Sequence, residues 1–318
     1  MSPIQQKSKP HRVFITGAAG LVGQNIMPAL VASGDYEIVG VDKHQANLAI
    51  LRSFHPDIRL IEADLSEPGP WQAEAAAADS IVMLHAQIGG LDGDAFERNN
   101  VTATRRVLDA AATGAAGYLV HISSSVVNSA AEDFYTESKK AQEALVETYP
   151  IRKVILRPTL MFGWFDRKHM GWLRRFLDRT PVFPIPGNGR FLRQPLFAGD
   201  FASIITACLQ SRIEGAYNIS GLESVDYIDM IRTLKQVTGA HAPIVKIPYG
   251  LFHVLLSTYA LVNRDPPFTT AQLKALATPD VFEVIDWPGL FGVRPTPLRE
   301  AFERTYRDPR FADVTLEF

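Results

Sequence analysis

The stretch VFITGAAGLVG, residues 13–23, joins a short apolar run to a series of spaced glycines. The run VFI is β-prone, and the residues from 21 to 33 follow with the spacing of a helix. In such a strand–turn–helix, Gly17 permits the tight turn, Gly20 lets a pyrophosphate approach the backbone, and Gly23 lets the helix pack on the strand. The N-terminus of the helix then offers free N–H groups and a positive dipole to an anion. The stretch therefore predicts the phosphate-binding turn of a dinucleotide fold.

An acidic residue ends the next β-prone run, YEIVGVD, residues 36–42. A carboxylate at this position can accept hydrogen bonds from both hydroxyls of an adenosine ribose, and it would repel a 2′-phosphate. Asp42 therefore favours NAD over NADP. Lys43 follows it and weakens the preference, because a cation can partly offset that repulsion.

The first half of the chain alternates β-rich runs with helical patterns, which is typical of a parallel sheet covered on both faces. This predicts an α/β fold with a Rossmann-like, doubly wound parallel sheet and a smaller C-terminal substrate lobe. We expect a disordered tail over 1–10, an NAD-binding domain over 11–157, and a lobe over 158–318 from which segments such as 215–219 return to the sheet. Strands are expected at 12–16, 36–41, 58–61, 80–84, 118–122 and 153–156, and helices at 21–33, 94–113, 135–148 and 200–210.

The composition argues against several classes of partner. The 318 residues carry a net charge of −2, so no global basic field would hold a nucleic acid. The single cysteine, Cys208, and the spacing of the histidines suggest no metal site. The longest apolar run, residues 247–262, is interrupted by proline, glycine and histidine and is too short to span a bilayer. We expect a cytoplasmic protein without stable membrane insertion.

A tyrosine and a lysine stand four residues apart in YTESK, residues 135–139. At this spacing Tyr135 and Lys139 share one face of a helix. A free tyrosine, with a pKa of about 10, is a poor base at neutral pH, but a nearby ammonium and an oxidised nicotinamide stabilise its phenolate. The pair predicts proton transfer at a substrate hydroxyl, with Lys139 also holding the nicotinamide ribose. Lys140 suits that role less well because it lies about 100° further around the helix.

A hydroxyl at the end of the preceding strand should orient the substrate oxygen, and Ser123, Ser124 and Ser125 all stand there. Alternate residues of a strand face opposite sides, so Ser124 cannot share its face with both neighbours. The residues by themselves leave the choice among the three serines open.

The order of these motifs resembles the extended short-chain dehydrogenases/reductases, and within them the NAD-dependent epimerase/dehydratase family. The resemblance rests on TGAAGLVG (16–23), VDK (41–43), ADL (63–65), the SSS run, YTESK and the pair Arg157–Pro158, and it covers about residues 11–305. It implies an NAD-dependent enzyme that acts on a sugar nucleotide, with Ser124, Tyr135 and Lys139 as the catalytic residues. It also implies that Arg193, in FLRQPLFAGD (191–200), binds the substrate diphosphate. The implied cofactor contacts are Gly17, Ala19, Gly20, Leu21, Val22, Gly23, Asp42, Asp64, Leu65, Lys139 and Pro158.

The sequence departs from the family pattern at several places. Ten residues separate Ser124 from Tyr135, where family members usually have a longer loop, so we expect a more open substrate pocket. Leu160 stands where an asparagine often contacts the substrate. Ser125 and Val126 follow Ser124 in place of the Asp-Glu pair of the 4,6-dehydratases, which disfavours dehydration.

These patterns support three functions. The first is an NAD-dependent sugar epimerase or ketoreductase, a homodimer that acts on a nucleotide-diphosphate sugar and pairs through the helices near 94–113 and 135–148. The second is an NAD-dependent oxidoreductase acting on a lipid-linked sugar or another small alcohol or ketone. The third is an NAD-binding structural subunit without turnover, against which the intact Ser/Tyr/Lys set argues.

Four further features are interpreted from the residues around them. Asp64 could cap the following segment or contact adenine, and Asp200 is expected to be the N-cap of the helix that follows it. His85 is expected to pack near the cofactor. The stretch GWFDRKHMGWLRRFLDR, residues 163–179, mixes aromatic and basic side chains. It indicates either an amphipathic helix of the lobe or a surface that meets a membrane or a lipid-linked diphosphate sugar.

Overall fold

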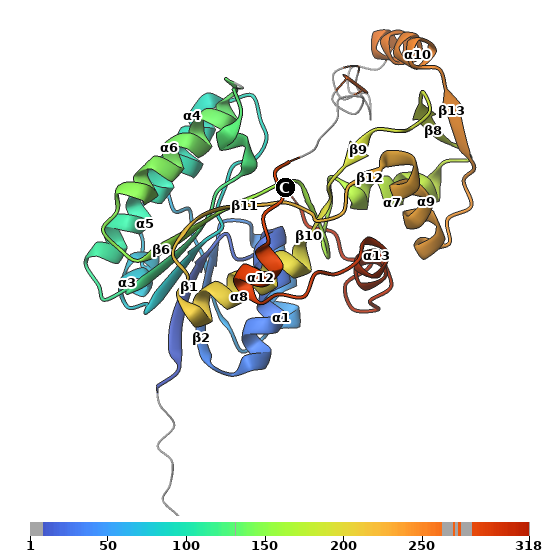
Figure 1. The fold of residues 1–318 in the computed structure, drawn as a ribbon. Helices are drawn as coiled ribbons and strands as arrows, with labels where there is room; N and C mark the ends of the chain where they lie inside the picture. Colours follow the sequence, from blue (N-terminus) through green and yellow to red (C-terminus); the bar gives the residue numbers. More distant parts are fainter. Residues whose placement is uncertain (1–8, 131, 263–269, 271–272, 275–281, 318) are drawn as a thin grey trace, which may run out of the picture.

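The central sheet has seven strands, all parallel, in the order β11-β6-β5-β4-β1-β2-β3 (Figure 1). The computed structural model describes residues 9–130, 132–262, 270, 273–274 and 282–317, so most of the expected tail at 1–10 lies outside the described residues. The six strands expected in the first half form within two residues of their predicted bounds, and 215–219 returns to pair with β6. The strands are β1 (His11–Thr16), β2 (Tyr36–Asp42), β3 (Arg59–Glu62), β4 (Ser80–Met83), β5 (Tyr118–Ile122), β6 (Lys153–Pro158) and β11 (Gly215–Ile219).

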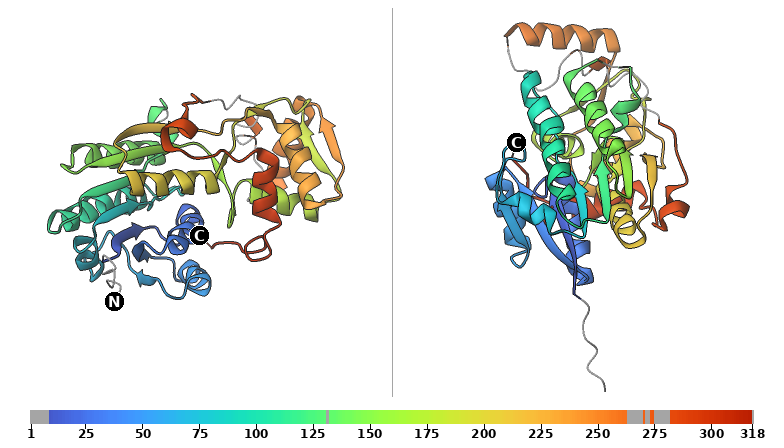
Figure 2. Two further views of the ribbon diagram at one scale, coloured as in Figure 1. Left: turned by 60° about the horizontal axis from the view of Figure 1, so that its bottom comes forward. Right: turned by 90° about the vertical axis from the view of Figure 1, so that its left-hand side faces the viewer.

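Helices cover both faces of this sheet, as the two further views show (Figure 2). Alternation along β1 explains the two layers, because Val13 and Ile15 enter one core and Phe14 enters the other. The expected doubly wound, Rossmann-like architecture is confirmed. One face carries α1 (Leu21–Ser33), α2 (Gln45–Phe54), α8 (Ala198–Ser211) and α12 (Trp287–Phe291), and the other carries α3 (Trp71–Ala76), α5 (Ala103–Ala112) and α6 (Phe134–Thr148).

The single helix expected over 94–113 is divided into three segments. α4 (Gly93–Phe96) leads into a π-helical turn, η1 (Glu97–Thr102), and α5 follows. The turn carries Asn100, which is fully buried and exchanges hydrogen bonds with the backbone of Gln87 and with Ser138. A wide turn of this kind re-aims side chains relative to regular helical spacing, and it often occurs at functional sites.

The C-terminal lobe has its own apolar core between α7 (Met170–Arg179), α9 (Tyr227–Thr238) and α13 (Leu298–Tyr306). Three short ladders complete it, and α10 (Tyr249–Val262) lies at its outer end (Figure 1). The expected N-cap role of Asp200 was wrong: α8 begins at Ala198, and Asp200 instead accepts hydrogen bonds from Thr296. The ladders pair β7 (Met161–Phe162) with β10 (Leu196–Phe197), β8 (Phe183–Pro186) with β13 (Ile244–Ile247), and β9 (Leu192–Arg193) with β12 (Val225–Asp226).

The segment 163–179 consists of α7 and the loop that leads into it. Leu173 and Leu177 of α7 are buried in the lobe core. Trp164 packs on Phe311 with ring centroids 4.7 Å apart, and its indole N–H donates to the carbonyl oxygen of Arg304. The aromatic side chains of this segment therefore serve packing, which favours the amphipathic-helix interpretation.

Close packing of α1 on the glycine turn predicts a stability effect at Gly23. A Cβ atom there would lie 2.2 Å from the carbonyl oxygen of Ala18, which is backbone and cannot move aside easily. We expect Gly23→Ala to lower the free energy of unfolding by about 2 kcal/mol, the range of an overpacked core. Urea unfolding measures it. Gly250→Ala, at a helical position with open space, is the control, and equal stability of the two variants would contradict this reading.

Candidate active site

The glycine turn lies at the carboxyl edge of the sheet, where the strand order reverses between β1 and β4. Gly17 has a φ of +63°, and a Cβ atom there would lie 2.8 Å from the backbone nitrogen of His85. Gly20 precedes α1 in an extended conformation, and no side chain caps the first amides of the helix. Half-buried Leu21 and Val22 form its first turn. The turn thus presents glycine-lined backbone and free N–H groups, the arrangement that fits a dinucleotide pyrophosphate.

Asp42 ends β2 beside this turn. Its carboxylate accepts hydrogen bonds from the backbone N–H of Ala19 and of His44, both at 3.0 Å, and it is 8% exposed. A carboxylate has further lone pairs for ribose hydroxyls. The ammonium of Lys43 is bound to Asn99 Oδ1 at 2.8 Å, so this lysine is engaged away from Asp42. The residues therefore fit the adenosine ribose of NAD.

Three other predicted cofactor contacts lie near the same edge of the sheet. Asp64 Oδ1 accepts from the backbone N–H and the hydroxyl of Ser66. Burial alone would raise the pKa of Asp64, but these hydrogen bonds, with Lys43 nearby, leave its pKa lowered. Leu65 is buried in the core beneath α3, and Pro158 is the buried last residue of β6. The two hydrogen bonds from Ser66 therefore support the interpretation that Asp64 caps the segment that follows it.

The hydroxyl of Ser124 lies near the phenol of Tyr135, close enough to lower its pKa. Ser124 follows β5 and precedes the 3₁₀ turn η2 (Ser125–Asn128), while Tyr135 lies in the first turn of α6. Asp133 caps that helix by accepting a hydrogen bond from the backbone N–H of Thr136, which fixes where the helix begins and so where Tyr135 lies in it. Burial raises the pKa of Tyr135; the Ser124 hydroxyl opposes this rise, and the charge of Asp133 adds to it.

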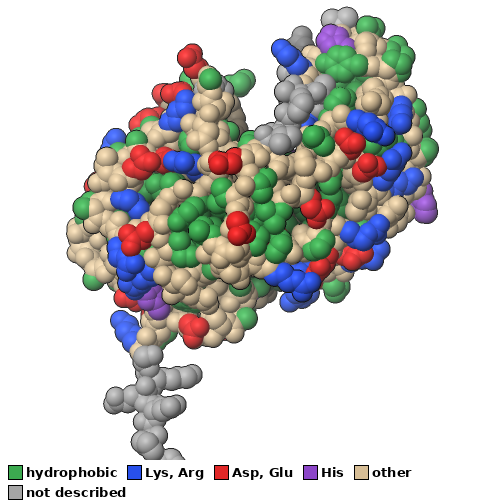
Figure 3. All heavy atoms as spheres, viewed as in Figure 1, with side chains coloured by type: hydrophobic (Ala, Val, Ile, Leu, Met, Phe, Trp, Pro, Cys, Tyr) green, Lys and Arg blue, Asp and Glu red, His purple; other side chains and the backbone are tan. Residues whose placement is uncertain are grey.

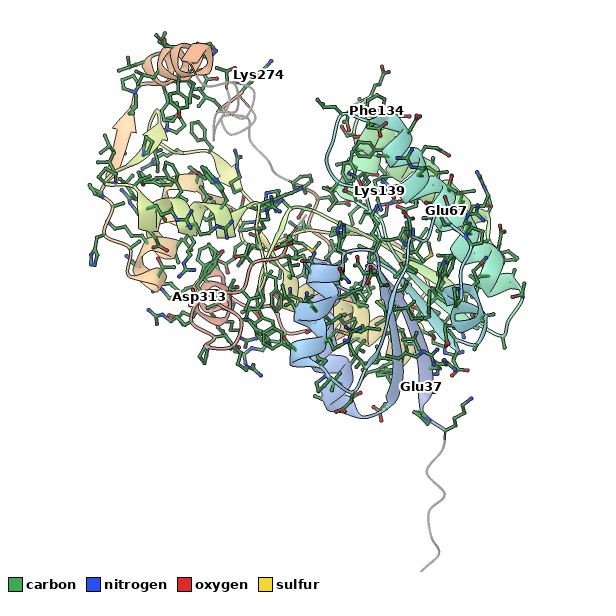
Figure 4. The ribbon with its side chains drawn as sticks, turned by 180° about the vertical axis from the view of Figure 1, so that it is seen from behind. Glu37, Glu67, Phe134, Lys139, Lys274 and Asp313 are labelled. Atoms are coloured by element: carbon green, nitrogen blue, oxygen red, sulfur yellow. The ribbon has the colours of Figure 1, made fainter. Side chains whose placement is uncertain are left out.

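Lys139 lies one turn further along α6 and is labelled below Phe134, which stands at the tip of the helix (Figure 4). Its side chain is 1% exposed, and its Nζ donates to the carbonyl oxygen of Ile122, at 3.0 Å, and to Gln142 Oε1. Burial lowers the pKa of Lys139 to about 7, against the opposing charge of Glu143. A group with this pKa exchanges protons near neutrality.

The other two serines of the run have different surroundings from Ser124. Ser123 donates a hydrogen bond to Glu143, which is buried. Glu143 also pairs with Arg157, and the hydrogen bond between these two side chains raises the pKa of Arg157. Ser125 begins η2. Ser123 is therefore committed to a structural ion pair that joins β5, α6 and β6.

A buried chain of hydrogen bonds extends from Lys139 to the glycine turn, and sequence reasoning missed most of it. Gln142 Nε2 donates to Thr104 Oγ1 at 2.8 Å, and Thr104 contacts His85 Nε2 at 3.1 Å. His85 Nδ1 lies 2.7 Å from the hydroxyl of Thr16, at the end of β1. Removal from water and the charge of Lys139 lower the pKa of His85 to about 3, so it is neutral at pH 7. The spacing of Gln142, three residues after Lys139 on one helix face, was the available signal.

The predicted diphosphate ligand, Arg193, lies in the C-terminal lobe. It lies in the short strand β9, paired with Val225 of β12, and donates to the carbonyl oxygen of Leu192 at 2.7 Å. Burial raises the pKa of the Tyr227 phenol, and the charge of Arg193 partly opposes that rise. A role in binding substrate stays a prediction.

The sequence matches the model of the NAD dependent epimerase/dehydratase family over residues 13–220. It is 24% identical over 243 residues to ceramide reductase of Caulobacter vibrioides, covering 74% of this chain and 73% of that protein. It is 22% identical to dTDP-4-dehydrorhamnose reductase of Aggregatibacter actinomycetemcomitans, covering 92% of this chain and 97% of that protein. The fold resembles UDP-glucuronic acid 4-epimerase of Bacillus cereus, solved with NAD, with a TM-score of 0.69, 21% identity, and coverage of 93% of this chain and 97% of that one.

Among the described residues, no helix has both the length and the apolar character needed to cross a membrane, and no group of metal-binding side chains is found.

A second buried histidine behind the site predicts how stability depends on pH. His121 of β5 is fully buried, neither ring nitrogen has a hydrogen-bond partner among the described residues, and burial holds its pKa well below the ordinary value. The unfolded chain therefore binds more protons than the folded one below pH of about 6.5, so stability falls as pH falls. Between about pH 7 and pH 5 this histidine should account for about 2 kcal/mol of lost stability.

Urea unfolding at both pH values compares the wild type with His121→Leu, which should lose that much less on acidification. Exposed His241→Leu serves as the control, because its side chain is in water in both states. The same pH dependence in the wild type and His121→Leu would show that the histidine is not held neutral.

Proposed function

Because the chain belongs to the NAD dependent epimerase/dehydratase family, we propose that it interconverts a hydroxyl and a ketone on a nucleotide-diphosphate sugar, as an epimerase or a ketoreductase. The observation that carries this proposal is the place of the Ser124 hydroxyl near the Tyr135 phenol, one helical turn from buried Lys139. The three side chains come from the segment after β5 and from α6, next to the carboxyl edge where the glycine turn lies.

The protein is an NAD-dependent enzyme, and NAD when bound supplies the hydride acceptor or donor. Gly17 and Gly20 would face its pyrophosphate, and Asp42 its adenosine ribose, since these positions offer free backbone and a nearly buried carboxylate. Lys139 would bind the nicotinamide ribose. Two of its three N–H donors are used by Ile122 and Gln142, so one remains for a ribose hydroxyl.

Tyr135 takes or returns the proton of the substrate hydroxyl, and Ser124 orients the substrate oxygen. The place of Ser124 near the Tyr135 phenol supports it over its neighbours, since Ser123 is bound to Glu143. Tyr135 needs help in this role because its surroundings raise its pKa. A positive charge one helical turn away favours the phenolate, and Lys139 would provide that charge. Its Nζ is bound to Gln142 and to the Ile122 carbonyl.

A second candidate function is the reduction of a ketone on a lipid. Leu160, in place of the family's asparagine, is 42% exposed, and Phe134, next to Tyr135, is 56% exposed. Apolar side chains at these places suit an alkyl chain better than a diphosphate. The relative named ceramide reductase is consistent with this candidate. A screen that follows NADH absorbance with sugar nucleotides and with long-chain ketones separates the two, and sugar interconversion without net NADH change identifies an epimerase.

The proposed proton transfer predicts the effect of Tyr135→Phe. Turnover of the substrate found in that screen should fall by about 10²–10⁴-fold, the usual contribution of a positioned acid–base group, while NAD affinity stays within about threefold. Tyr149→Phe, which changes the residue that ends the same helix, should retain activity. Steady-state kinetics and NAD titration measure both quantities. Normal turnover of Tyr135→Phe would exclude this mechanism.

A further inference from the structure

Residues 311–317, which we call the strap, run from the C-terminal lobe back to the helices that cover the central sheet. They follow α13, and in the left-hand view of Figure 2 the chain leaves this helix and ends beside the first helices of the chain. Figure 3 shows a hollow between the lobe and the part that carries α4 and α6, so the described residues of these two parts do not meet there. The strap is therefore one of the segments that fix how the lobe sits on the sheet.

A small apolar cluster holds the strap in place. The ring of Phe311, which is buried, has its centroid 4.8 Å from that of Phe54 on α2 and 5.3 Å from that of Phe165, in the loop before α7. Leu316 is buried in the same cluster, against which Ile50 of α2 also packs. Burial of apolar surface is the main favourable term in such contacts. The strap is thus docked on α2 and on the lobe at the same time.

Asn47, in the first turn of α2, is bound to the strap by two hydrogen bonds. Its Nδ2 donates to the carbonyl oxygen of Glu317 at 2.7 Å, and its Oδ1 accepts from the backbone N–H of Glu317 at 2.8 Å. The side chain of Asn47 is buried, and a buried amide that loses its partners is costly. These two bonds therefore tie the strap to the beginning of α2.

The same turn of α2 is joined to the glycine turn by Gln24 of α1. The Nε2 of this buried side chain donates to the carbonyl oxygens of Asn47 and of Ala19, both at 3.3 Å. Ala19, in the glycine turn, donates its backbone N–H to Asp42, the carboxylate that fits the adenosine ribose of NAD. Hydrogen bonds therefore extend without a break from the strap to the residues that fit the cofactor.

We propose that Asn47 is a positioning residue for NAD, through which docking of the strap and binding of NAD favour each other. Asn47 acts through Gln24 and Ala19: the docked strap holds the first turn of α2, and with it the glycine turn, in the arrangement that receives the cofactor. Such a coupling is reciprocal, so NAD must favour docking of the strap by the same factor by which the docked strap favours NAD. The proposal concerns cofactor binding and does not depend on the proposed function.

NAD titration of the full-length Asn47→Leu variant tests one direction of this coupling. The substitution removes both hydrogen bonds to Glu317 and keeps a side chain of similar size. We expect the dissociation constant of NAD to rise at least about fivefold, the lower end of couplings between sites. Asp313→Ala is the matched control in the strap. Asp313, labelled in Figure 4, pairs with Arg174 at 3.1 Å, but its side chain is 87% exposed, so the loss of this pair should leave NAD affinity unchanged.

Hydrogen exchange of the wild type tests the other direction, which a merely structural role of Asn47 would not affect. Saturating NAD should slow exchange of the strap amides, that of Glu317 included, by about the factor by which Asn47→Leu weakens NAD binding. Amides of α9, in the lobe core, are the reference and should exchange at the same rate with and without NAD.

Strap amides that exchange equally fast with and without NAD overturn the proposal, and so does equal slowing in α9, which would show general stabilisation only. Unchanged NAD affinity in Asn47→Leu, with a melting temperature that shows it to be folded, also overturns it. If the variant does not fold, the exchange measurement on the wild type decides alone.

Discussion

Burial of the Lys139 ammonium is the constraint on which the rest of the candidate site depends. A buried charge is tolerated only with hydrogen-bond partners, and this one has the Ile122 carbonyl and the Gln142 amide. Burial nevertheless lowers its pKa to about 7, so small changes in its surroundings decide whether it carries a proton at neutrality. The carboxylate of Glu143, on the same helix, favours the charged form. The end of β5 and the face of α6 are therefore arranged around one amine.

This arrangement extends well beyond the lysine. Gln142 can turn its carbonyl toward Lys139 because its amide nitrogen is held by Thr104, on a different helix. Neutral His85 then joins Thr104 to Thr16, the last residue of the strand before the glycine turn. The glycine turn and Lys139 are thus connected by a continuous chain of hydrogen bonds. Buried polar groups with every partner satisfied fix a single arrangement, which suits a site that must place two groups accurately.

Local patterns were sufficient to predict the parts of the site that lie close together in the sequence. The glycine turn follows from spacing within residues 13–23, and the pairing of Tyr135 with Lys139 follows from one helical turn. The contacts of Gln142 with Thr104 and of Ser123 with Glu143 join residues 38 and 20 apart, and no periodicity reveals such partners. The π-helical turn at Asn100 was missed because its apolar spacing is close to that of a regular helix. In the lobe, the mixed aromatic and basic composition of 163–179 left its role open, and the structure shows that its aromatic side chains are packed.

In the proposed mechanism, Lys139 lowers the pKa of Tyr135 once NAD⁺ is bound. Ultraviolet difference titration of tyrosinate measures it directly, with the spectrum of Tyr135→Phe subtracted and the protein saturated with NAD⁺. We predict that Tyr135 ionises below the ordinary tyrosine pKa of about 10 in the wild type, and at least about one unit higher in Lys139→Met. The same Tyr135 pKa in both proteins would contradict the account.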